Sequence, residues 1–133
     1  MIATLFLGLT LIFAQAGKAV TLPDTPQGKH VAAYIKAFNT GDEKQFLAAH
    51  ELHMAKSSLA KRTAADRVQL FKRMQGDFGT LKVQQVVKST PQQIQILVPT
   101  TGGEEATMTF DFEKDAPFGI AGIGVDIKGG DRE

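Results

Sequence analysis

The hydrophobic residues of the chain change their spacing once, close to Leu81. Before this point they recur three or four positions apart, as in Val31, Tyr34 and Phe38, which is the spacing of one buried helix face. After it they alternate with polar residues, as in a strand buried on one side. Helices followed by consecutive strands with short turns predict an α+β domain, in which the helices cover one face of an antiparallel sheet.

Three helices are predicted before the change in spacing, each starting at a side chain that can cap a helix N-terminus. The caps are Thr25, Asp42 and Thr63. Gln45 follows Asp42 by three residues, which is the spacing of a capping box, and Asp66 follows Thr63 in the same way. The first two helices should cover about 26–38 and 43–52, and the third should end at the glycines of 76–79. A short helix or turn is expected at 57–61.

About four strands are predicted after the change in spacing. The alternation covers residues 81–88, 94–98, 106–112 and 120–127, with turns at 90–91, 99–103 and 115–117. In the third strand every second residue should face the helices: Ala106, Met108, Phe110 and Phe112. The residues between them should face outward, because successive side chains of a strand point to opposite sides.

Residues 1–16 have the pattern of a secretory signal peptide. An uncharged apolar run is followed by Ala14, Gln15 and Ala16, a small-x-small cleavage site. No Lys or Arg precedes the run, so an N-terminal core helix and an uncleaved membrane anchor stay open as alternatives. Residues 17–24 are then a linker, 25–128 the folded domain and 129–133 a disordered tail. The protein is expected to be secreted or periplasmic.

Composition limits the chemistry that the chain can perform. Its 133 residues suit a single domain with one core. The formal net charge of +1 gives no overall attraction to nucleic acids or anionic membranes. The absence of cysteine excludes disulfides, thiolate zinc sites and a thiol nucleophile. We expect no nucleic-acid partner and, after signal cleavage, no membrane association.

Two segments carry a resemblance to a known superfamily. The first reads AYIKAFNTGDEKQF and the second TFDFEKDAPFGIAGIGV. They resemble the first two helices and the last two strands of NTF2-like (SnoaL-like, cystatin-like) domains, in the subgroup found ahead of secreted serine hydrolases and tail-specific peptidases. The resemblance covers about residues 28–127. It implies a curved sheet wrapped around three N-terminal helices, forming a cone with a pocket at its open end.

The resemblance says more about fold than about activity, because this superfold hosts both enzymes and binding modules. No signature of the hydrolase domain that follows in the larger relatives is present in the sequence. The expected function is a non-catalytic domain that binds a small apolar or peptide-like ligand, or a dimerising accessory module that forms a homodimer through its sheet. We expect the pocket to be lined by a set of mostly aromatic residues: Tyr34, Phe38, Phe46, His50, Phe71, Met108 and Phe110.

The alternative is a small enzyme of the ketosteroid isomerase kind. In that branch of the superfamily a Tyr at the place of Tyr34 donates a hydrogen bond to an oxyanion. The reaction also needs a carboxylate base and a second, protonated acid beside the Tyr. The segments expected to supply them, near His53 and along 106–112, hold no inward-facing acid. Asp111 or Asp126 would have to turn inward, so Tyr34 is interpreted as a core or pocket-lining residue.

Two polar patterns are interpreted as structural. His50 and His53 lie three residues apart, but a metal site needs a third ligand, so a surface or rim pair is favoured and no metal or cofactor is predicted. His30 has no evident partner in the sequence. Residues 56–73 hold six basic side chains against one acid, Asp66. This charge could steer an anionic ligand, but a solvated helix face is the favoured interpretation.

Overall fold

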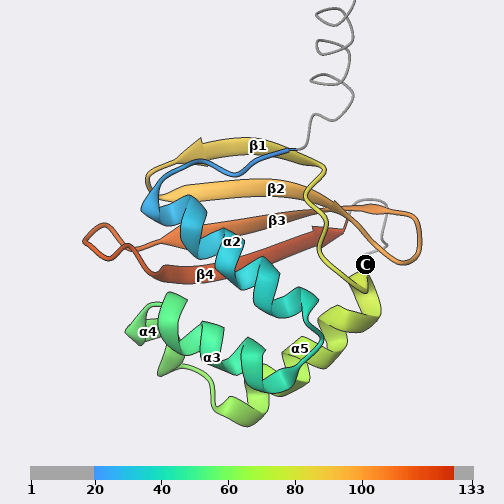
Figure 1. Ribbon diagram of the computed structural model, residues 1–133, viewed down its shortest axis with the longest axis horizontal. Coiled ribbons are helices and arrows are strands. Elements are labelled where there is room, and N and C mark those ends of the chain that lie inside the picture. Colours follow the sequence, from blue (N-terminus) through green and yellow to red (C-terminus); the bar gives the residue numbers. More distant parts are fainter. Residues whose placement is uncertain (1–19, 128–133) are drawn as a thin grey trace, which may run out of the picture.

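The computed structural model describes residues 20–127 and has the α+β architecture that the sequence predicts. Within these residues, four helices come first and four strands follow. The strands form one open antiparallel sheet in the order β1-β2-β3-β4. Figure 1 shows α2 lying across the sheet, with α3, α4 and α5 grouped on the β4 side.

The helices are α2 (Pro26–Asn39), α3 (Glu43–His53), α4 (Lys56–Leu59) and α5 (Ala64–Phe78). The three long ones match the predicted helices closely. The single-turn α4 lies where the sequence predicts a short helix or turn, at about residues 57–61. Within residues 20–127, no helix has the length and apolar character needed to cross a membrane.

The predicted caps form at all three long helices. Thr25 Oγ1 accepts from Gly28 N at 3.0 Å, and Thr63 and Asp66 make the reciprocal bonds of a complete capping box. The box predicted at Asp42 closes only in part. Its carboxylate accepts from Lys44 N at 3.1 Å, but its own N–H donates to Thr40 Oγ1, so no backbone donor is left for a returning side chain.

The strands are β1 (Gln85–Thr90), β2 (Gln93–Pro99), β3 (Glu105–Phe112) and β4 (Ile120–Ile127). The last three agree with the predicted alternation. The first begins four residues later than predicted. The reason is Asn39, whose side chain accepts from Leu81 N at 2.7 Å and donates to Leu81 O at 3.0 Å. Both backbone groups of Leu81 are therefore occupied before a partner strand can use them.

The core lies between the helices and the inner face of the sheet. From the strands it receives Ile94, Ile96, Val98, Ala106, Met108, Phe110 and Phe112, all buried. From the helices it receives aromatic rings in contact with one another. Phe46 stacks on Phe71 with ring centroids 4.5 Å apart, and Tyr34 meets Phe46 edge-on at 5.5 Å. Such aromatic pairs add stability beyond the area they bury.

The connection between α3 and α4 is attached to the free edge of β4. Ala55 N donates to Ile120 O at 2.8 Å, and Ser58 Oγ donates to Ala121 O. Gly119 allows this contact, because a Cβ there would lie 3.1 Å from Ala55 Cα. The hydrogen bonds hold the helical layer against the start of the last strand.

Some sequence predictions concern parts of the chain that the structure does not describe. The signal peptide (1–16), most of the linker (17–24) and the C-terminal tail (129–133) lie outside residues 20–127.

Candidate pocket between the helices and the last strand

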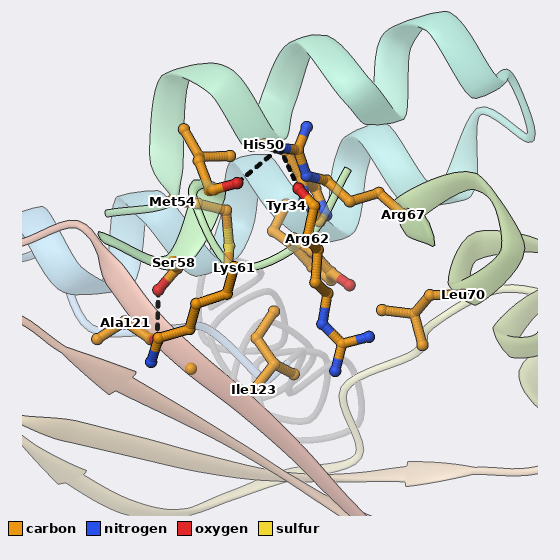
Figure 2. A pocket seen from close by; sticks show the side chains of 12 residues that line it. Tyr34, His50, Met54, Ser58, Lys61, Arg62, Arg67, Leu70, Ala121 and Ile123 are labelled. Atoms are coloured by element: carbon orange, nitrogen blue, oxygen red, sulfur yellow. Dashed lines mark hydrogen bonds between the residues drawn. The ribbon is translucent and has the colours of Figure 1, made fainter. Parts of the chain in front are cut away.

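A pocket of about 230 Å³ lies between α3, α4, α5 and β4 (Figure 2). Its apolar walls come from both layers. The helical layer contributes Met54, Leu59 and Leu70, and the strand contributes Ala121, Gly122 and Ile123. Apolar walls with a few placed polar groups are characteristic of small-molecule sites, and the volume suits a small ligand.

Tyr34 and His50 supply the buried polar groups of the pocket. Tyr34 is 1 % exposed, and its hydroxyl donates to Met74 Sδ at 3.8 Å, a weak acceptor. Burial raises the pKa of Tyr34, so the phenol keeps its proton at neutral pH. The ring of His50 lies 5.6 Å from the Tyr34 ring and 4.4 Å from the Phe46 ring, between centroids.

His50 lines the pocket and has a buried nitrogen that is unpaired within the described residues. The residue is 4 % exposed, and among residues 20–127 its Nε2 has no hydrogen-bond partner. Burial, with a smaller contribution from the charge of Arg67, lowers the pKa of His50 from 6.5 to about 4. The imidazole is therefore neutral at pH 7. A buried polar atom without a partner is costly, which makes it a natural contact for a bound molecule.

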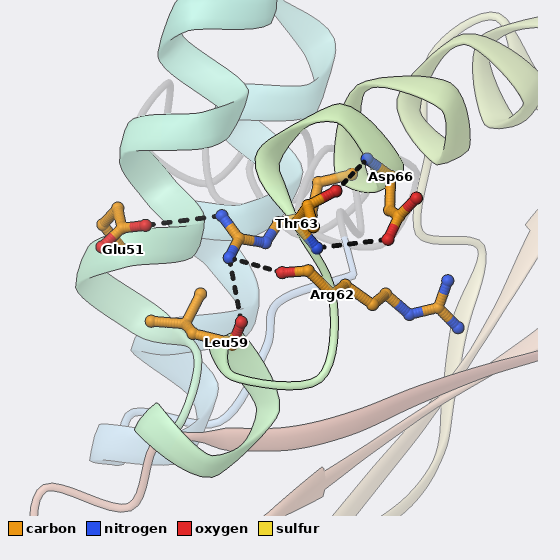
Figure 3. A network of polar contacts seen from close by, with 6 residues as sticks. Glu51, Leu59, Arg62, Thr63 and Asp66 are labelled. Carbon is orange, nitrogen blue, oxygen red and sulfur yellow. Dashed lines mark hydrogen bonds and ion pairs between the residues drawn. The ribbon is translucent and has the colours of Figure 1, made fainter.

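Arg67 holds together the segment that forms one side of the pocket (Figure 3). The residue is 8 % exposed, and its Nη2 donates to Leu59 O at 3.1 Å and to Arg62 O at 3.0 Å. Nη1 donates to Glu51 Oε2 at 3.4 Å. One buried cation thus connects α5 to α3 and to both ends of the loop after α4. The neighbouring Thr63–Asp66 capping box fixes the start of α5 beside it.

Lys61 and Arg62 form the exposed side of the pocket. Figure 2 shows both side chains reaching from this loop toward the strand that carries Ala121 and Ile123. Among residues 20–127, neither side chain forms an ion pair. The part of the chain that the structure describes contributes no Asp or Glu to the lining. The pocket therefore carries a positive electrostatic potential.

The structure brings two of the seven predicted pocket residues to this pocket, Tyr34 and His50. The other five are at most 1 % exposed and pack in the core behind them: Phe38, Phe46, Phe71, Met108 and Phe110. The sequence interpretation placed Lys61, Arg62 and Arg67 in the basic run of residues 56–73, but favoured a solvated helix face for it. A signal for Arg67 was present, because it precedes Phe71 by four residues and Met74 by seven and so shares their buried helix face.

The histidines do not form the surface or rim pair that their spacing suggested. His50 points into the core, whereas His53 pairs with His30, the residue without an evident partner in the sequence. Their Nδ1 atoms are 2.9 Å apart, and His30 Nε2 donates to Pro117 O at 2.8 Å. Residues 20–127 contain no group of three or more potential ligand side chains that could hold a metal ion.

The carboxylates that an isomerase would need do not approach Tyr34. Asp111 and Asp126 are both exposed, and Asp111 Oδ1 accepts from Gln93 Nε2 at 2.8 Å. The strand phases are those predicted, with Phe110 and Phe112 inward and Asp111 outward. Within the described residues, the Tyr34 hydroxyl therefore has no carboxylate as a hydrogen-bond partner.

No protein-family model matches the chain, and neither the curated proteins nor the solved structures contain a match to it.

Proposed function

We propose that this chain is a non-catalytic, NTF2-like domain of an exported protein, and that it binds a small, largely apolar ligand between α3, α5 and β4. The observation that carries this proposal is the pocket of about 230 Å³, lined in part by His50, whose Nε2 has no partner among the described residues. The order of elements, with helices on one face of an antiparallel sheet, is compatible with the cone-shaped NTF2-like fold.

The absence of catalysis is proposed from the ionisation of the two central side chains. A Tyr that polarises a carbonyl needs a base nearby to move the proton, and Tyr34 donates to a thioether instead. His50 is neutral at pH 7 and far from the operating range of a general base, because its pKa is about 4. Both groups are suited to hydrogen bonding with a ligand.

Association through the outer face of the sheet is proposed as a second role. This face carries Gln and Thr side chains, of which Gln95 donates to Thr109 at 3.2 Å, together with the exposed acids Asp111 and Asp126. A homodimer built on it would need to bury roughly 800 Å² on each partner. Light scattering coupled to size-exclusion chromatography would measure the mass, and a monomer at all concentrations would contradict this role.

Ligand binding can be followed with an intrinsic reporter. Tyr34 is the only tyrosine, and the chain has no tryptophan. Titration with octan-1-ol should therefore give a saturable change in fluorescence from a single ring in the pocket. Ile123→Phe should weaken this binding at least tenfold, because it fills the space between Tyr34 and β4.

Val87→Phe is the matched control, since it adds the same ring to an exposed position on β1, at the far edge of the sheet. It should leave the titration unchanged. The proposal fails if the unmodified protein shows no saturable response, or if both variants respond like it.

A further inference from the structure

The pocket adjoins a second hollow along the inner side of β4. This hollow measures about 140 Å³ and shares Tyr34, Leu70 and Ile123 with the pocket. Beyond these shared residues it is lined mainly by apolar side chains of α5 and β4, including Met74, Phe78 and Val125. Val125 is 43 % exposed although it faces the same side of the sheet as Met108, its partner across the strand pair.

The two hollows differ in their charge and hydrogen-bonding groups. The first is lined by Tyr34 and His50 and by the cationic residues Lys61, Arg62 and Arg67. Only Arg67 has a carboxylate partner among residues 20–127, and that partner, Glu51, does not line the pocket. The second hollow presents thioether, aromatic and aliphatic surface, and its lining contains one basic residue, Arg73, and one acidic residue, Asp77. One end is thus suited to an anion and the other to a hydrocarbon.

The cationic end is held in place before any ligand arrives. Arg67 binds the carbonyls of Leu59 and Arg62, which fixes the backbone from which Lys61 and Arg62 extend (Figure 3). A ligand therefore does not have to order this loop, and less conformational entropy is lost on binding.

From this juxtaposition we propose that the natural ligand is an amphipathic monocarboxylate resembling a medium-chain fatty acid. Its carboxylate accepts hydrogen bonds from Lys61 and Arg62, and its chain passes Tyr34 toward Val125. The inference deepens the proposed ligand-binding function and rests on it.

The charge assignment is tested with three probes that share an eight-carbon chain: octanoate, octan-1-ol and octylammonium. Tyr34 fluorescence should show octanoate binding at least tenfold more tightly than octan-1-ol, and octylammonium more weakly than either. The double variant Lys61→Gln/Arg62→Gln should weaken octanoate binding tenfold or more and leave octan-1-ol within twofold. Both residues are exposed, so the fold should be retained.

The matched control is Lys82→Gln/Lys88→Gln, which removes the same charge from exposed residues at the β1 edge, opposite β4. Octanoate binding should be unchanged in it. Equal loss in both double variants would show a general charge effect and overturn the assignment. Equal affinity for octanoate and octan-1-ol would also overturn it, while the proposed binding function would stand. If no probe binds, both fall.

The chain assignment is tested with a length series from butanoate to octanoate. Burial of each methylene group should tighten binding by roughly fourfold as the chain extends along the second hollow. Val125→Asn should flatten this dependence for the longer probes and leave butanoate unaffected. If octanoate binds no better than butanoate, the chain does not occupy the second hollow.

Discussion

His50 should make the stability of the fold depend on pH. Its pKa is 6.5 in the unfolded chain and about 4 in the folded protein, because burial and Arg67 disfavour the imidazolium. The unfolded state binds more protons between these values. The free energy of unfolding is therefore highest above pH 6.5. It falls as the pH drops toward 4, and the total loss due to His50 is about 3 kcal/mol. Urea denaturation at pH 7 and pH 4.5 measures it.

His50→Phe is the comparison variant, since Phe keeps a ring against Phe46 without a titratable group. Between pH 7 and pH 4.5, the free energy of unfolding should fall less in His50→Phe than in the unmodified protein. The difference should be most of the loss that we attribute to His50, about 2 to 3 kcal/mol. The carboxylates titrate in both proteins and cancel in the difference, and so does His53, whose pKa is lowered by burial and by His30. Equal pH dependence in the two proteins would contradict the assignment to His50.

The Arg67 side chain connects α5 to α3 and to the loop after α4, so its removal should destabilise the contacts among all three. Arg67→Gln removes the donors to two backbone carbonyls and the partner of Glu51. We expect the free energy of unfolding to fall by about 2 kcal/mol, measured by denaturation. The pKa of His50 should rise, because a nearby positive charge that disfavours the imidazolium is gone.

Lys72→Gln is the matched control on the same helix, where an exposed ion pair with Glu43 is lost instead. It should change stability by less than about 1 kcal/mol. An NMR titration of the His50 ring in both variants separates the electrostatic effect from a general loosening of the fold. A lower or unchanged His50 pKa in Arg67→Gln would contradict the proposed role of Arg67.

The start of α5 is an element whose local sequence determines its structure. Thr63 and Asp66 satisfy each other's backbone donors, so Thr63→Ala should lower stability by about 1 kcal/mol. Thr63→Ser keeps the hydroxyl and should recover most of the loss. Thermal or urea denaturation compares the two. If Ala and Ser behave alike, the hydroxyl contributes nothing at this position.

The elements were largely predictable because caps and spacing are local properties of the sequence. Thr25 and Thr63 mark helix starts, and the alternation in β3 correctly places Ala106 and Phe110 inward. The predicted start of β1 failed for a non-local reason. Asn39, which is 42 residues away, binds both backbone groups of Leu81, and no pattern around Leu81 could indicate that.

The pocket was less predictable than the fold. Periodicity shows which face of a helix or strand is buried, but it does not show whether that face packs against other side chains or lines a cavity. Tyr34 and Phe46 lie on equally buried faces, yet Tyr34 lines the pocket of about 230 Å³ and Phe46 packs behind it. The interpretation of the basic residues was wrong for a different reason. A basic run is usually solvated, but Arg67 shares the apolar face of α5, and its burial brings Lys61 and Arg62 to the pocket.

At the scale of the whole molecule, the two layers meet at the β4 edge, where Gly119 passes close to Ala55. A Cβ at residue 119 would lie 3.1 Å from both the Cα and the N of Ala55. Gly119→Ala should therefore push the α3–α4 connection away from Ile120 and cost about 2 kcal/mol of stability. Because the same connection borders the pocket, octan-1-ol binding should weaken as well.

Gly124→Ala tests whether the effect comes from the contact between Gly119 and Ala55 or from the loss of any glycine in this part of the chain. Gly124 lies within β4, five residues after Gly119, but nothing stands within 4 Å of the position that its Cβ would occupy. That substitution should leave stability unchanged or raise it slightly, because Ala restricts the unfolded chain. Denaturation and octan-1-ol titration of the two variants should therefore diverge. Parallel behaviour would mean that the pocket does not depend on the contact between Gly119 and Ala55.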